Sequence, residues 1–210
     1  MLKIWGRAGS ANVMKLLWCC AEIGIPYERV DIGGDFGGLD TPDYLAMNPN
    51  GRIPVIQDEV DGKTFTLWES NTILRYLCAR HSAGRLYPDN LQQRADIERW
   101  MDWNICHILP GMQAMFFGLI RTPPEQRNLA AIENGRQQNE LSWRLLDRHL
   151  AGRIYICGDA LSMAEFGLGI MAYRWLSLPI ERPTLPHLEA WQKRLADREA
   201  YRTYVMLPLV

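Results

Sequence analysis

The sequence predicts a small α/β domain followed by an all-helical domain. Runs with the composition of strands occur only in the first part of the chain, where they alternate with helical periodicity in the order β-α-β-α-β-β-α. Every later periodic segment has the spacing of a helix. Residues 82–89 bring in Ser, Gly and Pro, a composition typical of a linker. We therefore predict one domain at 1–81, a linker at 82–89 and a second domain at 90–210.

The first part of the α/β domain has the pattern of a β-α-β unit. Leu2–Trp5 and Tyr27–Ile32 have strand composition, and Val13–Ile23 between them carries the apolar periodicity of a helix, stopped by Gly24 and Pro26. Because the connection is long enough for a crossover helix, the two strands should be parallel and the crossover right-handed.

The second part has the pattern of a β-β-α unit, preceded by a short helix. The expected elements are a glycine-rich loop at 33–39, a helix at 42–47, a turn at 48–51, strands at 54–58 and 64–68 around the hairpin turn Asp61-Gly62, and a helix from Ser70 to about His81.

The second domain is predicted to contain helices at about 91–120, 125–150, 162–177 and 186–205. Residues 103–120 carry no Asp, Glu, Lys or Arg, and their number is near the minimum for a membrane span. The same segment holds Asn104, His107 and Pro110, which would insert poorly into lipid. We therefore expect a helix buried in a protein core, and no membrane partner.

Composition excludes several classes of function. The 23 Lys and Arg residues against 24 Asp and Glu give a net charge of −1, so no broad field attracts nucleic acid or anionic lipid. The five cysteines form no C-x-x-C pair, the N-terminus shows no secretory leader, and a cytoplasmic location is expected. The four histidines are far apart, so we predict no metal. Hydrolase and nucleotide-binding motifs of the G-x-S-x-G and Walker types are missing.

The strongest local signal is Ile53-Pro54, because the proline stands directly after a turn and at the start of a predicted strand. If this peptide bond is cis, the amide and carbonyl of Ile53 would point outward and pair with an extended ligand. The alternative is an ordinary trans bond at a strand start, which base rates favour.

A second signal is Glu69-Ser70, where a strand ends and a helix begins. Ser70 is a suitable N-cap, and the free amides of a first helical turn bind anions such as a carboxylate. Glu69 suits an ammonium group, so the pair matches the two charged groups of an amino acid. The alternative is a capped helix with an acidic residue placed favourably for the helix dipole.

A third signal is Ser10 with Asn12, between the first strand and the first helix. A hydroxyl and an amide at a helix N-terminus can donate hydrogen bonds to a thiolate and lower the pKa of a thiol. The alternative is again capping, since Ser and Asn are preferred N-caps.

Together these sites resemble those of the soluble glutathione S-transferases, and the resemblance covers nearly the whole chain. It rests on Ser10-Ala11-Asn12, on Asn48-Pro49-Asn50-Gly51-Arg52-Ile53-Pro54-Val55, on Trp68-Glu69-Ser70, and on Ile73-Leu74-Arg75-Tyr76-Leu77. The resemblance implies a thioredoxin-like N-terminal domain that binds glutathione as co-substrate. It also implies an all-α helical-bundle C-terminal domain that offers a pocket to a second substrate, and a homodimer.

The resemblance also assigns residues to the glutathione site. Ile53 before a cis Pro54 would pair with the cysteinyl backbone, Glu69 and Ser70 would hold the γ-glutamyl end, and Arg52 would lie near the glycine carboxylate. Ser10 and Asn12 occupy the activating position, which resembles bacterial theta-like and nu-like members; which of the two contacts the sulfur stays open. The second-substrate pocket would draw on Trp103, His107, Met112, Met115 and Phe116, with a core role as the alternative for such residues.

In the helical half, Gly158–Glu165 resembles the buried capping segment of the family, with Ser162 and Glu165 at the spacing of a capping box. The family usually has Asp where this chain has Glu165.

The implied activity is transfer of glutathione, as its thiolate, to small hydrophobic electrophiles, with detoxification as the expected role. The alternatives are a glutathione-dependent reductase of disulfides or peroxides, and a non-enzymatic binding module.

Overall fold

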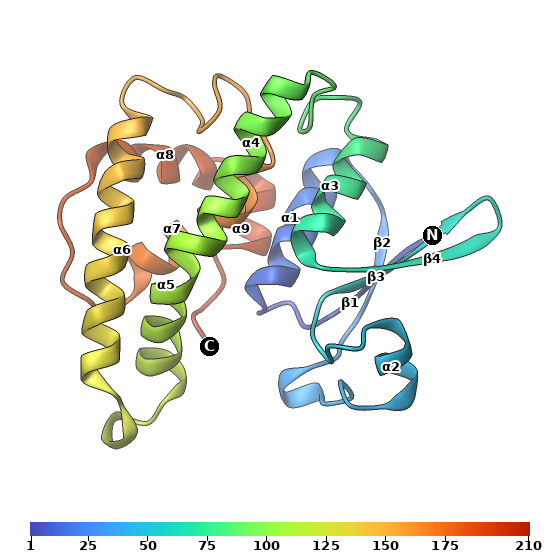
Figure 1. The fold of residues 1–210 in the computed structure, drawn as a ribbon, viewed down its shortest axis with the longest axis horizontal. Coiled ribbons are helices and arrows are strands. Elements are labelled where there is room, and N and C mark those ends of the chain that lie inside the picture. The colour runs from blue at the N-terminus through green and yellow to red at the C-terminus, as the bar shows by residue number, and fades with distance from the viewer. The chain divides into compact units, whose positions relative to one another are not determined.

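The computed structural model describes residues 1–210 and divides into two compact units, Met1–Pro88 and Asp89–Val210 (Figure 1). The division falls within the predicted linker at 82–89. The first unit is an α/β domain and the second is entirely helical, which confirms the predicted fold class.

A four-stranded sheet with the order β2-β1-β3-β4 forms the centre of the first unit. Its strands are β1 (Leu2–Trp5), β2 (Tyr27–Val30), β3 (Val55–Val60) and β4 (Lys63–Trp68). As predicted, β1 and β2 are parallel, whereas β1 pairs with β3 and β3 with β4 in antiparallel register. β2 ends at Val30, two residues earlier than predicted. The last hydrogen bond beside β1 runs from the amide of Gly6 to the carbonyl of Val30, and the pairing of the two strands stops there.

Helices α1 (Ala11–Ile23) and α3 (Ser70–His81) pack against each other and lie side by side in Figure 1. Every residue of α1 from 13 to 20 is buried, which includes Cys19 and Cys20. The thiols of Cys19 and Cys78 lie 3.5 Å apart between the two helices, and the hydrogen bond between them, together with burial, raises the pKa of Cys19. A short helix, α2 (Pro42–Met47), has the bounds that the sequence predicts.

The second unit contains α4 (Leu91–Trp103), α5 (Leu109–Phe116), α6 (Leu129–Leu150), α7 (Ala164–Ser177), α8 (Pro186–Ala196) and α9 (Glu199–Tyr204). A π-helical turn at Asn104–Ile108 joins α4 to α5, and a second one at Phe117–Arg121 extends the same helical run beyond α5. None of the helices combines the length and the apolar character that crossing a membrane requires.

Three helix boundaries in the second unit differ from the prediction, and in the first unit α1 begins at Ala11, two residues earlier than predicted. α6 begins at Leu129, because Asn128 caps it by accepting a hydrogen bond from the amide of Ala131. The segment predicted as one helix at 186–205 is two helices, since Arg198 takes an extended conformation. α7 begins at Ala164, two residues later than predicted.

The core of the second unit depends on a close approach of α5 and α6. A Cβ atom added at Gly111 would lie 2.7 Å from the carbonyl oxygen of Gly135, a distance that real side chains do not reach. Beside this crossing, the buried amide of Asn139 donates to the carbonyl of Ile108 at 3.1 Å. The hydrogen bond from Asn139 satisfies the buried carbonyl of Ile108, the last residue of the π-helical turn before α5.

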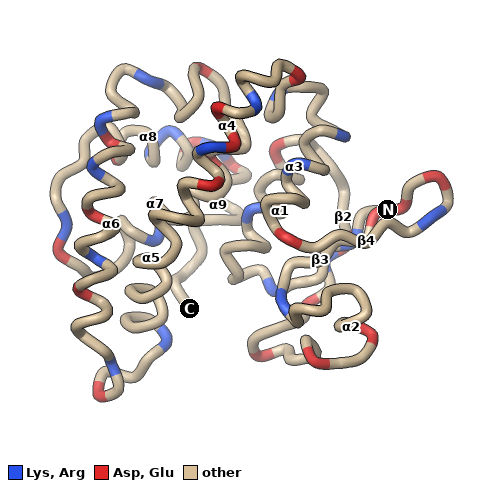
Figure 2. The backbone as a smooth tube through the Cα atoms, in the orientation of Figure 1, with Lys and Arg blue, Asp and Glu red and all other residues tan.

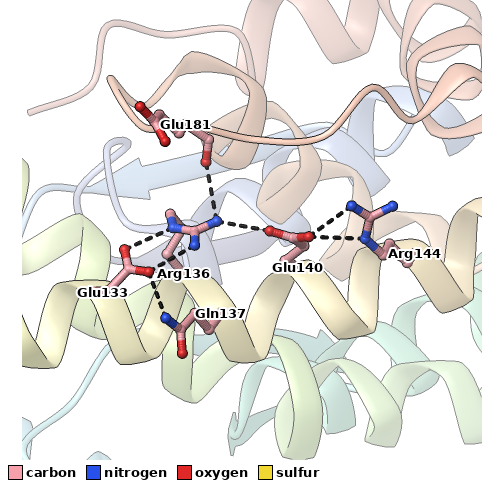
Figure 3. A network of polar contacts seen from close by, with 6 residues as sticks. All are labelled: Glu133, Arg136, Gln137, Glu140, Arg144 and Glu181. Carbon is pink, nitrogen blue, oxygen red and sulfur yellow. Dashed lines mark hydrogen bonds and ion pairs between the residues drawn. The ribbon is translucent and has the colours of Figure 1, made fainter.

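Charged residues of both signs are interspersed along the chain in both units (Figure 2). One surface network runs along α6, where Arg136 bonds Glu133 and Glu140, and Arg144 bonds Glu140 (Figure 3). Arg136 also donates to the carbonyl of Glu181. Because hydrogen bonds to these arginines favour the carboxylate form, the pKa values of Glu133 and Glu140 are lowered.

Candidate functional site

A pocket of about 390 Å³ opens in the first unit. It is lined by Asn12, Asn48, Asn50, Arg52, Ile53, Pro54, Glu69 and Ser70. All the residues predicted to bind glutathione are in this set, together with Asn12 from the predicted activating pair. Three segments that are distant in sequence therefore meet at one site: the start of α1, the loop before β3 and the start of α3.

The loop before β3 presents free backbone groups to the pocket. The Ile53-Pro54 bond is cis, as anticipated. The loop is held from inside, because the carbonyl of Arg52 accepts hydrogen bonds from the hydroxyl of Tyr44 at 2.8 Å and the amide of Asn48 at 2.7 Å. The amide and carbonyl of Ile53 have no partner within the chain. A short stretch of backbone is thus available to an extended ligand, as a sheet edge would be.

The start of α3 differs by one residue from the prediction. Glu69, not Ser70, is the N-cap, and Ser70 is the first helical residue. Glu69 has φ 73°, a left-handed conformation that costs a non-glycine residue about 1 kcal/mol or more. Such strained residues concentrate at binding sites. The shift leaves the Ser70 amide as one of the free donors of the first turn, beside the exposed carboxylate of Glu69.

A chain of side-chain hydrogen bonds runs from the core to the pocket. Lys15 of α1 is only 3% exposed, and its ammonium donates to Ser70 Oγ at 3.2 Å and to Asn71 Oδ1 at 3.1 Å. The Ser70 hydroxyl in turn donates to Asn12 Oδ1 at 3.3 Å. Burial lowers the pKa of Lys15 to about 8, while the negative charge of Glu69 opposes that shift.

Sequence reasoning missed Lys15, because it counted as an ordinary polar position within a helix of apolar periodicity. The available signal was its place on the buried face. Residues 13–20 of α1 are all buried, so a lysine between Met14 and Leu16 has its charged group inside the protein.

The two candidates for the activating position differ in their surroundings. Ser10 is the N-cap residue of α1, but its hydroxyl makes no capping hydrogen bond, so the alternative assignment as a side-chain cap is not observed. Asn12 lines the pocket, and its side-chain nitrogen has no acceptor in the chain. Asn12 is therefore the residue of this pair that the structure places at the pocket, whereas Ser10 is not among the lining residues.

The residues predicted for a second substrate fall into two groups within the second unit. The rings of Trp103 and His107 stack with centroids 5.8 Å apart, and His107 is exposed. Met112, Met115 and Phe116 are at most 3% exposed, so they pack in the helical core. This burial favours the core role that such residues usually have, and their assignment to a pocket stays a prediction.

One half of the predicted capping box is formed in the second unit, where Glu165 bonds back to Ser162, but the N-cap residue of α7 is Met163, not Ser162, and it makes no side-chain capping bond. The carboxyl group of Glu165 is fully buried and accepts from the Ser162 amide at 2.9 Å, from the Ser162 hydroxyl at 2.7 Å and from the Ile156 amide at 2.7 Å. Burial nevertheless raises the pKa of Glu165 to about 7.

Comparison with known proteins identifies the family. Residues 9–80 match the family model of the glutathione S-transferase N-terminal domain. Over 209 aligned residues the chain is 36% identical to the glutathione S-transferase GstB of Escherichia coli, with full coverage of both proteins. The chain belongs to the glutathione S-transferase family. The resemblance seen in the sequence is thus confirmed.

Other glutathione S-transferases support the assignment. The structure of a theta class glutathione S-transferase from Xanthomonas axonopodis pv. citri, with glutathione bound, has a TM-score of 0.93 and 42% identity, and the match covers 100% of this chain and 99% of that one. Glutathione S-transferase 4 of Zea mays is 29% identical over 95% of this chain and 89% of its own. The first unit of this glutathione S-transferase is therefore a thioredoxin-like domain.

Proposed function

We propose that this protein is an active glutathione transferase that binds glutathione in the pocket of its first unit and uses the thiolate to attack small hydrophobic electrophiles. One observation carries the proposal. A single pocket combines a free backbone edge at Ile53, a carboxylate at Glu69, the amide end of α3 at Ser70, and a free side-chain donor at Asn12 near the start of α1.

Each of these groups complements a part of glutathione. The Ile53 amide and carbonyl pair with the cysteinyl backbone of the tripeptide, as a strand pairs with a sheet edge. Glu69 binds the γ-glutamyl ammonium, and the Ser70 amide and hydroxyl bind the neighbouring carboxylate. Arg52 also lines the pocket and takes the glycine carboxylate.

Activation of the thiol falls to Asn12 and Ser10. Asn12 lines the pocket and holds a side-chain nitrogen without an acceptor, so we assign it the contact with the sulfur; Ser10 supports it from the N-cap. Hydrogen bonds to a thiolate and the positive end of α1 both favour the charged form of sulfur. The thiol pKa of bound glutathione should therefore lie below that of the free tripeptide.

The reaction then needs no covalent intermediate on the protein. The thiol releases its proton to solvent, and the thiolate donates an electron pair to an electrophilic carbon. The new carbon–sulfur bond forms as a leaving group departs, or as a conjugated double bond takes up a proton. The gain in rate comes from the larger thiolate fraction and from holding two reactants together. Trp103 and His107 are proposed as contacts of the electrophile.

A homodimer and a cytoplasmic location complete the proposal. The homodimer is carried over from the family, and the location is supported by the composition and the cysteine pattern. Sedimentation equilibrium over a range of concentrations tests the first point, and cell fractionation tests the second.

The decisive experiment is the ultraviolet thiolate absorbance of bound glutathione against pH. The parent protein should titrate below the ordinary thiol pKa of about 8.5, and Asn12→Ala should return the pKa toward that value, with Ser10→Ala giving a smaller change. If the parent shows no lowered thiol pKa, the thiolate mechanism is wrong.

Turnover assays separate the proposed activity from its alternatives. Conjugation of chlorodinitrobenzene should depend on Asn12. Faster reduction of a small disulfide or of an organic peroxide than any conjugation would instead assign a reductase, and no turnover with any of them would assign a binding module.

A further inference from the structure

The buried ammonium of Lys15 is an unusual feature of the first unit. Lysine is almost never fully buried unless a carboxylate pairs with it, because the charge loses its hydration. Lys15 is 3% exposed, and its two hydrogen-bond acceptors, Ser70 Oγ and Asn71 Oδ1, are both neutral. Its neighbours in α1 are buried apolar residues, so packing alone would accept an apolar side chain at this position.

Both acceptors belong to the first turn of α3, which is the end of the helix that faces the pocket. The ammonium therefore lies beside the first turn of α3, and Lys15 is not among the residues that line the pocket. It adds a full positive charge to the partial charge that a helix N-terminus already carries. An anion that binds at Ser70 would be attracted both by the ammonium of Lys15 and by the partial positive charge of the helix N-terminus.

The hydrogen bond from Lys15 also fixes the direction of the Ser70 hydroxyl. An ammonium has donors only, so Ser70 Oγ accepts from it and must turn its own proton elsewhere. In the free protein that proton goes to Asn12 Oδ1 at 3.3 Å, which is long for an O–H···O hydrogen bond. A ligand carboxylate in the pocket would make a shorter, charge-assisted bond in its place.

We propose that Lys15 is a positioning residue for glutathione. Its hydrogen bond to Ser70 Oγ directs the hydroxyl proton of Ser70 toward the pocket, and its positive charge attracts the γ-glutamyl carboxylate. When the carboxylate accepts the hydrogen bond of the Ser70 hydroxyl, Asn12 Oδ1 loses that bond and the Asn12 amide is free to turn toward the sulfur. Binding of one end of glutathione is thereby coupled to the residue that faces the thiol. This inference rests on the proposed function.

The charges around Lys15 make the effect dependent on pH. Glu69 is the charged group whose field acts on Lys15, and Ser70 and Asn71 are neutral. In the free protein, burial brings the pKa of Lys15 to about 8. A bound carboxylate favours the ammonium form, so binding near pH 8 should take up protons.

The size of the effect follows from the geometry. One hydroxyl group would separate the ammonium from the ligand carboxylate, which places the two charges about 6 Å apart at normal hydrogen-bond lengths. Removal of a unit charge at that distance weakens binding by about threefold in water and by about a hundredfold at the effective dielectric constant near a protein surface.

The test uses calorimetric binding of S-methylglutathione, which has no thiol to titrate, and of the matching compound that lacks only the γ-glutamyl carboxylate. Lys15→Met should weaken binding of the first compound by threefold to a hundredfold and leave the second unchanged. Lys15→Arg, which keeps a charge at all pH values, should restore part of the loss. Lys3→Met removes the same charge from an exposed ion pair with Glu28 and serves as the control.

A measurement on the unaltered protein covers the case in which the Lys15 variants do not fold. Calorimetry at pH 8 in two buffers gives the protons taken up, and the compound with the carboxylate should take up more than the compound without it. Equal uptake for the two compounds, or equal weakening of both by Lys15→Met, would overturn the role of Lys15 while leaving the proposed function intact. Failure of the unaltered protein to bind S-methylglutathione would overturn both.

Discussion

Raising the pH from 5 to 8 should destabilise the folded protein through the carboxyl group of Glu165. Burial raises the pKa of this group to about 7, against 4.5 for an ordinary glutamate. Between these values the folded state holds a proton that the unfolded state has released. The free energy of unfolding must then fall as the pH rises, and it becomes level above pH 7.

The magnitude follows from the difference between the two pKa values. At about 1.4 kcal/mol for each unit of pKa, the loss amounts to about 3 kcal/mol across the window. This is a large part of the 5–15 kcal/mol that typically separates folded and unfolded states. The three hydrogen bonds from Ser162 and Ile156 favour the carboxylate and oppose the shift, so burial is the dominant cause.

Urea unfolding at several pH values tests this reasoning, with Glu165→Gln as the comparison. The glutamine variant cannot titrate, and subtraction of its curve removes the contributions of all other groups. The unaltered protein should lose about 3 kcal/mol relative to the variant between pH 5 and pH 8. A difference that stays constant, or one in which the unaltered protein gains stability as the pH rises, would show that the hydrogen bonds outweigh burial.

Three further substitutions test other parts of the structure. Lys15→Met should stabilise the unliganded protein by up to about 3 kcal/mol at pH 7, because the pKa of Lys15 is lowered from 10.5 to about 8 by burial. In the unaltered protein, stability should rise between pH 8 and pH 10.5 as the folded state releases this proton first. Gly111→Ala should cost about 1–3 kcal/mol or more in thermal unfolding, because its Cβ would lie 2.7 Å from the Gly135 carbonyl oxygen. Arg136→Ala should change urea stability by less than about 1 kcal/mol, since its ion pairs with Glu133 and Glu140 lie at the surface and are screened by salt.

A specific result would contradict each of these three predictions. A Lys15→Met protein that is less stable than the parent at pH 7 would mean that the ammonium is well solvated. For the glycine, Gly152→Ala is the matched variant outside the helices: no atom lies within 4 Å of its added Cβ, so any cost there arises from its φ of 73° alone. A large loss of stability for Arg136→Ala at high salt would show that the arginine stem, not its charge, matters on α6.

Much of the fold follows from local patterns in the sequence. The strands β1 to β4 and helices α1 to α3 were predictable because each has its own periodicity and a clear stop, such as Gly24 after α1. The break between α8 and α9 was not, because no glycine or proline marks it. The extended conformation of Arg198 leads into α9, in which the buried hydroxyl of Tyr201 donates to the carbonyl of Gly169.

The site was predictable where a motif fixes backbone geometry and unpredictable where distant residues meet. Ile53-Pro54 and Glu69-Ser70 were found from sequence, although the cap position shifted from Ser70 to Glu69. Serine is the better cap by preference, but the chain enters α3 with Glu69 in a left-handed conformation, which tertiary structure imposes. The contact of Lys15 with Ser70 joins positions that are 55 residues apart, so no local pattern contains it.

The two π-helical turns that flank α5 set the angular phase of the longest helical run. A turn closed by i→i+5 bonds takes up one residue more than an α-helical turn, which rotates every later side chain by about 100° relative to a regular helix. Deletion of one residue within Asn104–Ile108 would remove the surplus residue and restore regular bonding there, and Met112 and Met115 would still face the core that buries them. A deletion within the regular part of α4 has no surplus residue to remove and would rotate Met112 and Met115 away from that core by about 100°. This run should therefore tolerate the loss of a residue at its π-helical turns and not elsewhere.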